Sequence, residues 1–305
     1  MTKSPHKRRI LVLFRPNASA KRDQKLLPVL FREIQKHGAA FDFHPTSLEM
    51  SAEKLVRKHL KRIHTGLLVV GGDGTIQSAV HGLVAAGFEK KIPLGIVPHG
   101  TGNDFYRLIG SEKNVVRQVE IALLGKTRGL DLGECNGRIF VNGVGIGFDG
   151  LVGHHKSRKP GAGPLVYFWT VLKLLFTYEG FRIKKQDRFK NFFGKPDEVF
   201  LSATVGNGHS FGGGFKLTPR AKADDGKLDL CLLTRRNICY NLFHLSKTKN
   251  GTHLALPIAH YAQVKDFEIE GHEDLPIHID GEVAFAKKIK IGLSKKKILV
   301  RMGHS

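Results

Sequence analysis

One apolar run that ends in glycines constrains the fold of this chain more than any other feature. Residues 67–70 (Leu-Leu-Val-Val) are typical of a buried strand, and Gly71-Gly72-Asp73-Gly74-Thr75 follow directly. This pattern predicts a tight turn into a helix that begins near Ile76, as in α/β proteins with parallel sheets. Glycines let backbone N–H groups approach an anion, and a helix N-terminus adds partial positive charge. The segment therefore predicts a phosphate-binding turn.

Asp73, in the middle of this turn, indicates a cation beside the phosphate. A carboxylate repels phosphate unless a cation lies between them, so we expect Mg²⁺, bound directly or through water. The simpler interpretation is a plain connector between a strand and a helix. The P-loop lysine and the dinucleotide-binding pattern G-x-G-x-x-G are both missing after this strand, so neither of those sites is expected.

A second turn of the same kind strengthens the phosphate interpretation. Residues 92–98 are typical of another buried strand, and His99-Gly100-Thr101-Gly102-Asn103-Asp104-Phe105 follow. Turns at the carboxyl ends of strands in one sheet can face a shared crevice, where open α/β sheets bind ligands. Thr75 and Thr101 can donate to phosphate oxygens, and Asp104 can help to order the water around a metal. Taken alone, Asn103 and Asp104 are equally typical of helix capping.

Net charge and cysteine content indicate which partners and which cellular compartment to expect. The 305 residues include 49 Lys and Arg against 27 Asp and Glu, a net charge of +22. Such an excess favours anionic lipid or nucleic acid as a partner, although a solvated basic coat is the simpler alternative. Cys135, Cys231 and Cys239 have no paired spacing, so we expect a reducing compartment and thiols that are either buried or inert.

Neither a signal peptide nor a membrane span is expected. The basic N-terminus is followed by an apolar run of only residues 10–14, and no stretch reaches the roughly 18 apolar residues that a span needs. We therefore expect a cytoplasmic protein that associates peripherally with membranes.

The order of predicted elements indicates two domains. Strands at 9–14, 40–44, 67–70 and 92–98 alternate with helices at 24–36, 52–63, 76–86 and 115–124, which predicts an α/β domain with a parallel sheet. After residue 129 an Asn136-Gly137 hairpin signal appears, followed by strand-like segments at 199–205, 227–233, 263–270, 276–279, 288–291 and 297–302. This half predicts an antiparallel β-sandwich or barrel.

One helical segment, residues 165–176, interrupts the β half and is apolar on most sides. Its cationic flanks and its central tryptophan are typical of a membrane-facing helix. A core helix packed on the β domain is the interpretation we prefer, with the basic flanks left as membrane contacts: Lys156, Arg158, Lys159, Arg182, Lys184, Lys185 and Arg188.

Taken together, the motifs resemble the diacylglycerol kinase catalytic family of lipid kinases over nearly the whole chain. Bacterial soluble diacylglycerol kinases are the most similar, and sphingosine and ceramide kinases are more distant. The resemblance rests on residues 71–75, 100–105, 131–133, 142–149, 206–208, 212–214, 219–229 and 280–282.

This resemblance implies a nucleotide-binding, Rossmann-like or NAD-kinase-like α/β domain at residues 1–130 and a β-sandwich lipid domain at residues 131–288. In such kinases the last strand often returns to the first domain, which suggests the same for residues 289–305. The family transfers the γ-phosphoryl group of ATP to a lipid hydroxyl with Mg²⁺.

The resemblance also implies the site residues. Gly71, Gly72, Asp73, Gly74, Thr75, Ile76 and Gln77 would hold the phosphates of ATP, with Thr101, Thr46 and Asn17 of the 15–21 loop as further nucleotide contacts. Asp73, Asp104 and Asp131 would surround Mg²⁺ through water. A second, structural metal would bind Asp225 by its carboxylate and Lys222 and Lys227 by their backbone carbonyls.

Asp280-Gly281-Glu282 is similar to the source of the catalytic base. A carboxylate suffices there, because phosphoryl transfer needs only an oriented hydroxyl and a late proton acceptor. In a strand the two acids would face one side, so both remain candidates, with Glu282 slightly preferred.

Two departures from the family pattern affect the nucleotide site. Arg15-Pro16 stand where Asn-Pro is usual, and Gln77-Ser78 stand where Asn-Glu is usual. The second departure removes an acid that would support the site by hydrogen bonding.

Two other functions stay open from the sequence. An NAD kinase shares the Gly-Gly-Asp-Gly-Thr turn, although the other motifs favour lipid. A degenerate kinase fold could also serve as a basic membrane adaptor, whereas the lack of base-stacking motifs argues against nucleic acid. The lipid is not identified, and a homodimer is left open.

Overall fold

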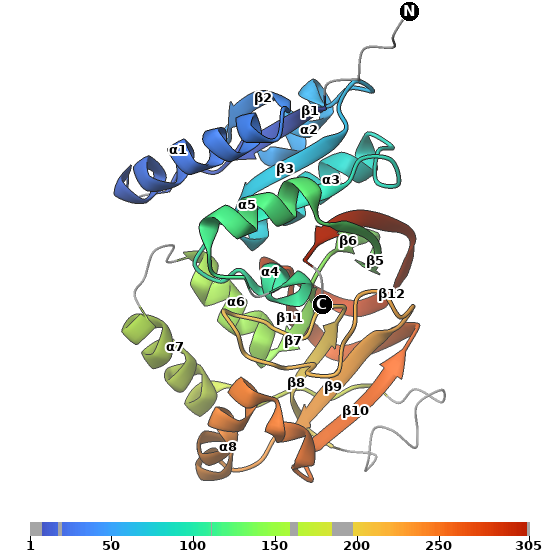
Figure 1. Cartoon of the computed structure of the whole chain (residues 1–305). Coiled ribbons are helices and arrows are strands. Elements are labelled where there is room, and N and C mark those ends of the chain that lie inside the picture. Colours follow the sequence, from blue (N-terminus) through green and yellow to red (C-terminus); the bar gives the residue numbers. More distant parts are fainter. Residues whose placement is uncertain (1–7, 18–19, 111, 159–163, 185–197, 304–305) are drawn as a thin grey trace, which may run out of the picture. The chain divides into compact units, whose positions relative to one another are not determined.

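The computed structural model describes residues 8–17, 20–110, 112–158, 164–184 and 198–303. The chain divides into two compact units, the first made of Met1–Asp131 and Lys295–Ser305 and the second of Leu132–Ser294. The strands of both units belong to one twelve-stranded sheet, in which β12 pairs with β11 and, near its end, with β4 (Figure 1). None of the helices among the described residues is long and apolar enough to cross a lipid bilayer.

The first unit is built on a parallel sheet with strand order β2-β1-β3-β4, so the predicted α/β class is confirmed. Its elements, in chain order, are β1 Arg9–Phe14, α1 Ala20–Lys36, β2 Ala40–Pro45, α2 Ala52–His59, β3 Gly66–Gly71, α3 Asp73–Ala85, β4 Leu94–Pro98, α4 Asp104–Ile109 and α5 Val115–Leu124.

Helices cover both faces of this sheet. On one face, Val12 of β1 and Val70 of β3 pack with Leu30 of α1 and Val119 of α5. The alternate strand residues are equally buried, and α2 and α3 contact β1 and β3. Strands buried on both faces explain why β3 is a continuous apolar run and not an alternating one.

One glycine sets the distance between α5 and the sheet. A Cβ atom added to Gly95, in the middle of β4, would overlap the backbone carbonyl oxygen of Ala122 in α5. Because the obstruction is main chain, the helix itself would have to move to admit a side chain.

The second unit is an antiparallel sheet with strand order β10-β9-β8-β7-β11-β12, joined by the β5–β6 hairpin. Its strands are β5 Lys126–Cys135, β6 Arg138–Phe140, β7 Gly143–Gly147, β8 Phe200–Gly206, β9 Leu228–Thr234, β10 Ala259–Val264, β11 Asp266–Ile279 and β12 Glu282–Met302; its helices are α6 Phe148–Arg158, α7 Pro164–Thr177, α8 Ile238–Asn250 and the short η2 Thr252–Ala255. β5 begins and β12 ends in the first unit.

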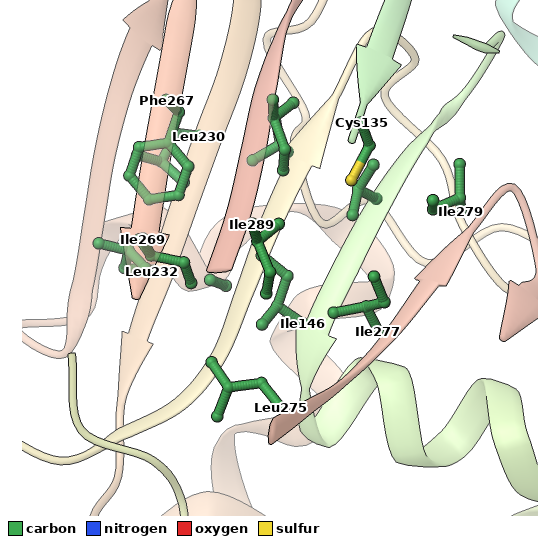
Figure 2. Packing of buried hydrophobic residues seen from close by; sticks show 14 of the residues in the cluster. Cys135, Ile146, Leu230, Leu232, Phe267, Ile269, Leu275, Ile277, Ile279 and Ile289 are labelled. Atoms are coloured by element: carbon green, nitrogen blue, oxygen red, sulfur yellow. The ribbon is translucent and has the colours of Figure 1, made fainter. Parts of the chain in front are cut away.

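The core of the second unit combines aliphatic side chains with several phenylalanines and lies between strands far apart in sequence. Figure 2 shows Ile146 of β7 near Ile277 of β11, and Leu230 of β9 near Phe267. Cys135 is part of this cluster, and burial raises the pKa of its thiol to about 11, so it stays protonated. Cys231 is buried too, whereas Cys239 is exposed.

Several predicted boundaries were wrong. Helix α3 begins at Asp73 and not near Ile76, because Gly72 already serves as its N-cap. The strand predicted at 263–270 is divided between β10 and β11, and the segments at 288–291 and 297–302 are parts of the single strand β12. Neither strand β7 nor helix α8 was predicted from the sequence.

A buried acid lies where β7 meets α6. Asp149 keeps some accessible surface, but its carboxylate lies within the protein, and this burial raises its pKa to about 6. The Thr204 hydroxyl donates a hydrogen bond to Asp149 Oδ2 and opposes the shift.

We predict that Gly95→Ala lowers the free energy of unfolding by at least roughly 2 kcal/mol, since it overpacks α5 against β4. Urea denaturation followed by circular dichroism measures the change. Gly129→Ala is the matched control, because a Cβ there meets no atom within 4 Å. Equal stability of the two variants would contradict the assigned contact.

A pH-dependent effect is expected from Asp149. A carboxyl pKa raised in the folded state favours folding below the unfolded-state pKa, and that contribution is lost as the pH rises through about 6. Between pH 5 and pH 8 the wild type should lose about 1 kcal/mol from this group. Asp149→Asn should remove that loss, so urea unfolding at the two pH values should differ less in the variant. An unchanged pH difference would contradict the assignment.

Candidate functional site

The two glycine turns of the first unit pack directly against each other. The His99 N–H donates to the Gly71 carbonyl oxygen at 2.9 Å. A Cβ atom added to Gly100 would lie only 2.5 Å from the Cα of Gly72, so the two main chains touch where side chains would prevent it. Because β3 and β4 are neighbouring parallel strands, both turns lie at the same edge of the sheet.

The N-terminus of α3 at this edge suits an anion. Gly72 is the N-cap, and no side chain makes a capping hydrogen bond to it. A Cβ atom added to Gly74 would meet nothing within 4 Å, so the first turn of the helix borders open space. Free N–H groups and the helix dipole together favour a phosphate oxygen at such a position.

Asp73 links the two turns. Its Oδ1 accepts a hydrogen bond from the Phe105 N–H at 2.9 Å, which ties the start of α3 to the start of α4. Asn103 stands at the N-cap of α4 in the left-handed region with φ 55°, but its side chain caps nothing there. It bonds to Gly100 instead, through the Gly100 N–H at 3.0 Å and the Gly100 carbonyl at 2.9 Å. The capping interpretation of Asn103 is therefore wrong, and the side chain stabilises its own turn.

The other two predicted metal-site acids are buried and paired with cations. Asp104 Oδ1 lies 3.1 Å from Arg107 Nη1, and Asp131 Oδ1 lies 2.7 Å from Lys297 Nζ. The His, Cys, Asp and Glu side chains in the described part of the chain form one group close enough to share an ion, and it does not include these aspartates. Direct ligation of one ion by all three aspartates does not fit this arrangement, and the water-mediated site stays a prediction.

The residues predicted to contact the nucleotide differ in burial and in hydrogen bonding. Thr46, after β2, and Gln77, in α3, are buried, and neither Thr46 Oγ1 nor Gln77 Nε2 has a hydrogen-bond partner within the described ranges. Thr101 is exposed, and Ile76 is fully buried, so its side chain belongs to the core. Asn17 donates its N–H to Asp23 Oδ2 at 2.9 Å. Ala18 and Ser19 of the same loop lie outside the described residues.

A histidine–aspartate pair at this edge was missed by sequence reasoning. His99 Nε2 lies 2.6 Å from Asp23 Oδ1, and both side chains are largely buried. The pair connects the first turn of α1, which contains Asp23, with the turn after β4, which contains His99. The only signal in the sequence was the position of His99 inside the second glycine turn, because Asp23 is 76 residues away.

In the second unit, Asp280 lies in a turn and not in a strand, which corrects the expectation that it shares a strand face with Glu282. It has φ 48° and sits between β11 and β12. Its carboxylate accepts three backbone N–H groups, from Val141 at 2.7 Å, Asn142 at 2.9 Å and Gly143 at 2.8 Å. These bonds occupy both oxygens, so the side chain holds the β6–β7 connection against this turn.

Glu282 has a different environment. It is the first residue of β12, its side chain is 51% exposed, and it pairs with Arg138 of β6. Arg138 was not singled out from the sequence, because it only acquires this neighbour when β6 and β12 come together. An exposed, oriented carboxylate can accept a proton from an incoming group.

The predicted structural-metal loop forms one tight turn before β9. Asp225 is exposed, and its Oδ1 accepts the Lys227 N–H at 3.0 Å while Gly226 takes φ 72°. The Lys227 ammonium donates to Gln263 Oε1 at 2.9 Å, and the metal site proposed for this loop stays a prediction. Lys222 is exposed in the same segment.

Comparisons with protein families and with known proteins test the family resemblance that the motifs indicate. Residues 9–135 match the family model described as diacylglycerol kinase catalytic domain, and residues 142–291 match the YegS C-terminal NAD kinase beta sandwich-like domain. A Pseudomonas aeruginosa protein described as "probable lipid kinase YegS-like" is 31% identical over 259 residues, 82% of this chain and 81% of that protein.

Two further relatives agree. A diacylglycerol kinase of Staphylococcus carnosus is 25% identical over 278 residues, 90% of this chain and 89% of that protein. A crystal structure of a diacylglycerol kinase from Bacillus anthracis has the same fold, with a TM-score of 0.69 at 21% identity over 97% of both chains. The resemblance indicated by the motifs is confirmed: the chain belongs to the diacylglycerol kinase catalytic domain family and carries a YegS-like C-terminal domain.

Proposed function

We propose that this chain is an ATP- and Mg²⁺-dependent lipid kinase that phosphorylates the hydroxyl group of a diacylglycerol-like lipid. The observation that carries the proposal is the contact between the two glycine turns, which gives an uncapped helix N-terminus at the edge of a parallel sheet. Membership of a kinase family implies ATP as the phosphate donor. Diacylglycerol is the acceptor named for several relatives.

The first unit would bind the nucleotide. The N–H groups at the start of α3 would donate to phosphate oxygens, and the Thr46 hydroxyl could reach the nucleotide by rotation about χ1. Asp73, Asp104 and Asp131 would hold hydrated Mg²⁺, which would supply neutralisation of the phosphate charge.

The second unit would supply the proton acceptor. The lipid hydroxyl oxygen bonds to the γ-phosphorus, the bond from that phosphorus to the β–γ bridging oxygen breaks, and ADP leaves. Glu282 would accept the hydroxyl proton, because its carboxylate is accessible, whereas that of Asp280 is engaged by three N–H donors. Asp280 would act as a positioning residue that fixes the turn before Glu282.

The first test is transfer of ³²P from [γ-³²P]ATP to lipids in mixed micelles. Asp73→Asn should lower kcat by roughly a hundredfold or more, since it removes a metal-site charge, and Glu282→Gln should lower kcat similarly by removing the proton acceptor. Glu134→Gln, an exposed acid of β5, is the control and should keep full activity. The absence of lipid phosphorylation by folded wild type would refute the proposal; NAD phosphorylation would instead indicate an NAD kinase, and vesicle binding alone an adaptor.

Comparing Asp280→Asn with Glu282→Gln should distinguish the positioning role of Asp280 from the role of Glu282 as proton acceptor. The amide offers a donor where the carboxylate accepts N–H groups, so we expect a loss of about 2–3 kcal/mol in the free energy of unfolding. Glu282→Gln should leave that free energy within about 0.5 kcal/mol of wild type, since surface ion pairs contribute little. Urea denaturation compares the two variants. A destabilised Glu282→Gln with an unaffected Asp280→Asn would reverse the assigned roles.

A further inference from the structure

The exposed aromatic side chains of this chain are concentrated on two helices. Eight large hydrophobic side chains are exposed among the described residues, and four of them are aromatic. Trp169 (64% exposed) and Phe176 (58%) lie on α7, and Phe243 (76%) lies on α8. Only Phe285 (54%) lies elsewhere, on β12.

The two helices are fixed on the second unit by their opposite faces. Leu174 and Leu175 of α7 are buried with Phe148, and Leu242 of α8 packs against the same cluster. The two helices contact each other, and both can be followed in Figure 1. The preference for α7 as a core helix therefore holds for one of its faces only.

The outer face of α7 alternates aromatic and basic groups. Trp169, Lys173 and Phe176 follow one another at spacings of four and three residues, so they lie on one side of the helix, and all three are exposed. On α8, Phe243 lies between the exposed Cys239 and Ser246, again at helical spacing. The outer surface of α7 and α8 is called here the aromatic face.

Charge around the aromatic face has one sign. Residues 164–178 and 235–250 contain Lys173, Arg235, Arg236, Lys247 and Lys249 and no aspartate or glutamate. Arg235 is held at the end of α7, where its Nε donates to the Tyr178 carbonyl at 3.3 Å. Glu179 and Glu198 lie just outside these segments, and Glu198 is occupied by the Thr234 hydroxyl at 2.9 Å. Of the predicted flanking cations, Lys159, Lys185 and Arg188 lie outside the described residues.

We propose that the aromatic face docks the protein onto an anionic lipid bilayer, with Trp169, Phe176 and Phe243 entering the interface and the basic residues contacting headgroups. Aromatic side chains next to cations are suited to this depth, where apolar burial and attraction to anionic lipid act together. The inference deepens the proposed lipid-kinase function and rests on it for the role of docking, which would bring the second unit to a substrate that stays in the membrane.

Flotation of the full chain with vesicles of phosphatidylglycerol and phosphatidylcholine, without ATP or diacylglycerol, measures docking alone. The double variant Phe176→Gln/Phe243→Gln should weaken vesicle partitioning by at least about tenfold, because two apolar groups are lost from the interface. Lys173→Gln should weaken it by about fivefold, and raising the salt concentration should weaken wild-type binding. Phe285→Gln is the matched control, with the same residue type and similar exposure, and should bind like wild type.

Activity measurements separate docking from catalysis. The double variant should keep wild-type turnover of a short-chain diacylglycerol dispersed in water and lose turnover on vesicles. A protein that is no kinase would transfer phosphate to neither substrate, yet the binding differences would persist.

Three results would overturn the docking proposal. The first is a folded double variant that binds vesicles like wild type, and the second is an equal loss in Phe285→Gln. The third is a dimer in sedimentation velocity that the double variant abolishes while vesicle binding is retained, which would assign the aromatic face to a second copy of the chain.

Discussion

The close approach of two main chains at Gly72 and Gly100 is the constraint on which the candidate site of the first unit depends. It is possible only because neither residue has a side chain, and it brings the ends of β3 and β4 into contact. Asp73 then spans the junction by accepting the Phe105 N–H. One short stretch of backbone contact thus orients an uncapped helix and an acidic side chain toward the same edge of the sheet.

In the second unit, a side chain holds two backbone segments together, whereas in the first unit two glycines allow the segments to touch. There a single carboxylate, Asp280, gathers three N–H groups of the β6–β7 connection, and charge-assisted bonds of this kind are stronger than neutral ones. The turn that holds Asp280 directly precedes Glu282, so the position of the exposed Glu282 depends on the hydrogen-bonded Asp280. Two acids of one motif, separated by one glycine, therefore lie in different environments, which neither residue type nor spacing could reveal.

Local patterns predicted most elements of the first unit, because its strands are continuous apolar runs and its helices are amphipathic. Prediction from local patterns failed for elements that depend on contacts with distant parts of the chain. Gly143–Gly147 forms β7 although glycine disfavours strands, since its neighbours on both sides supply hydrogen bonds. The sequence was sufficient to select the acidic site residues Asp73, Asp104, Asp131, Asp280 and Glu282. It did not predict that Asp104 pairs with Arg107, Asp131 with Lys297 and Glu282 with Arg138, because these distances are set only in the folded chain.

The division of the chain has a consequence for its synthesis. The second unit is inserted, as residues 132–294, into the first, whose sheet gains its last strand only when Val300 of β12 pairs with Leu94. On the ribosome the inserted unit is therefore available as a complete sequence before the surrounding one is. The β4 edge of the parallel sheet in the first unit therefore stays uncovered until Val300 has left the exit tunnel and can pair with Leu94.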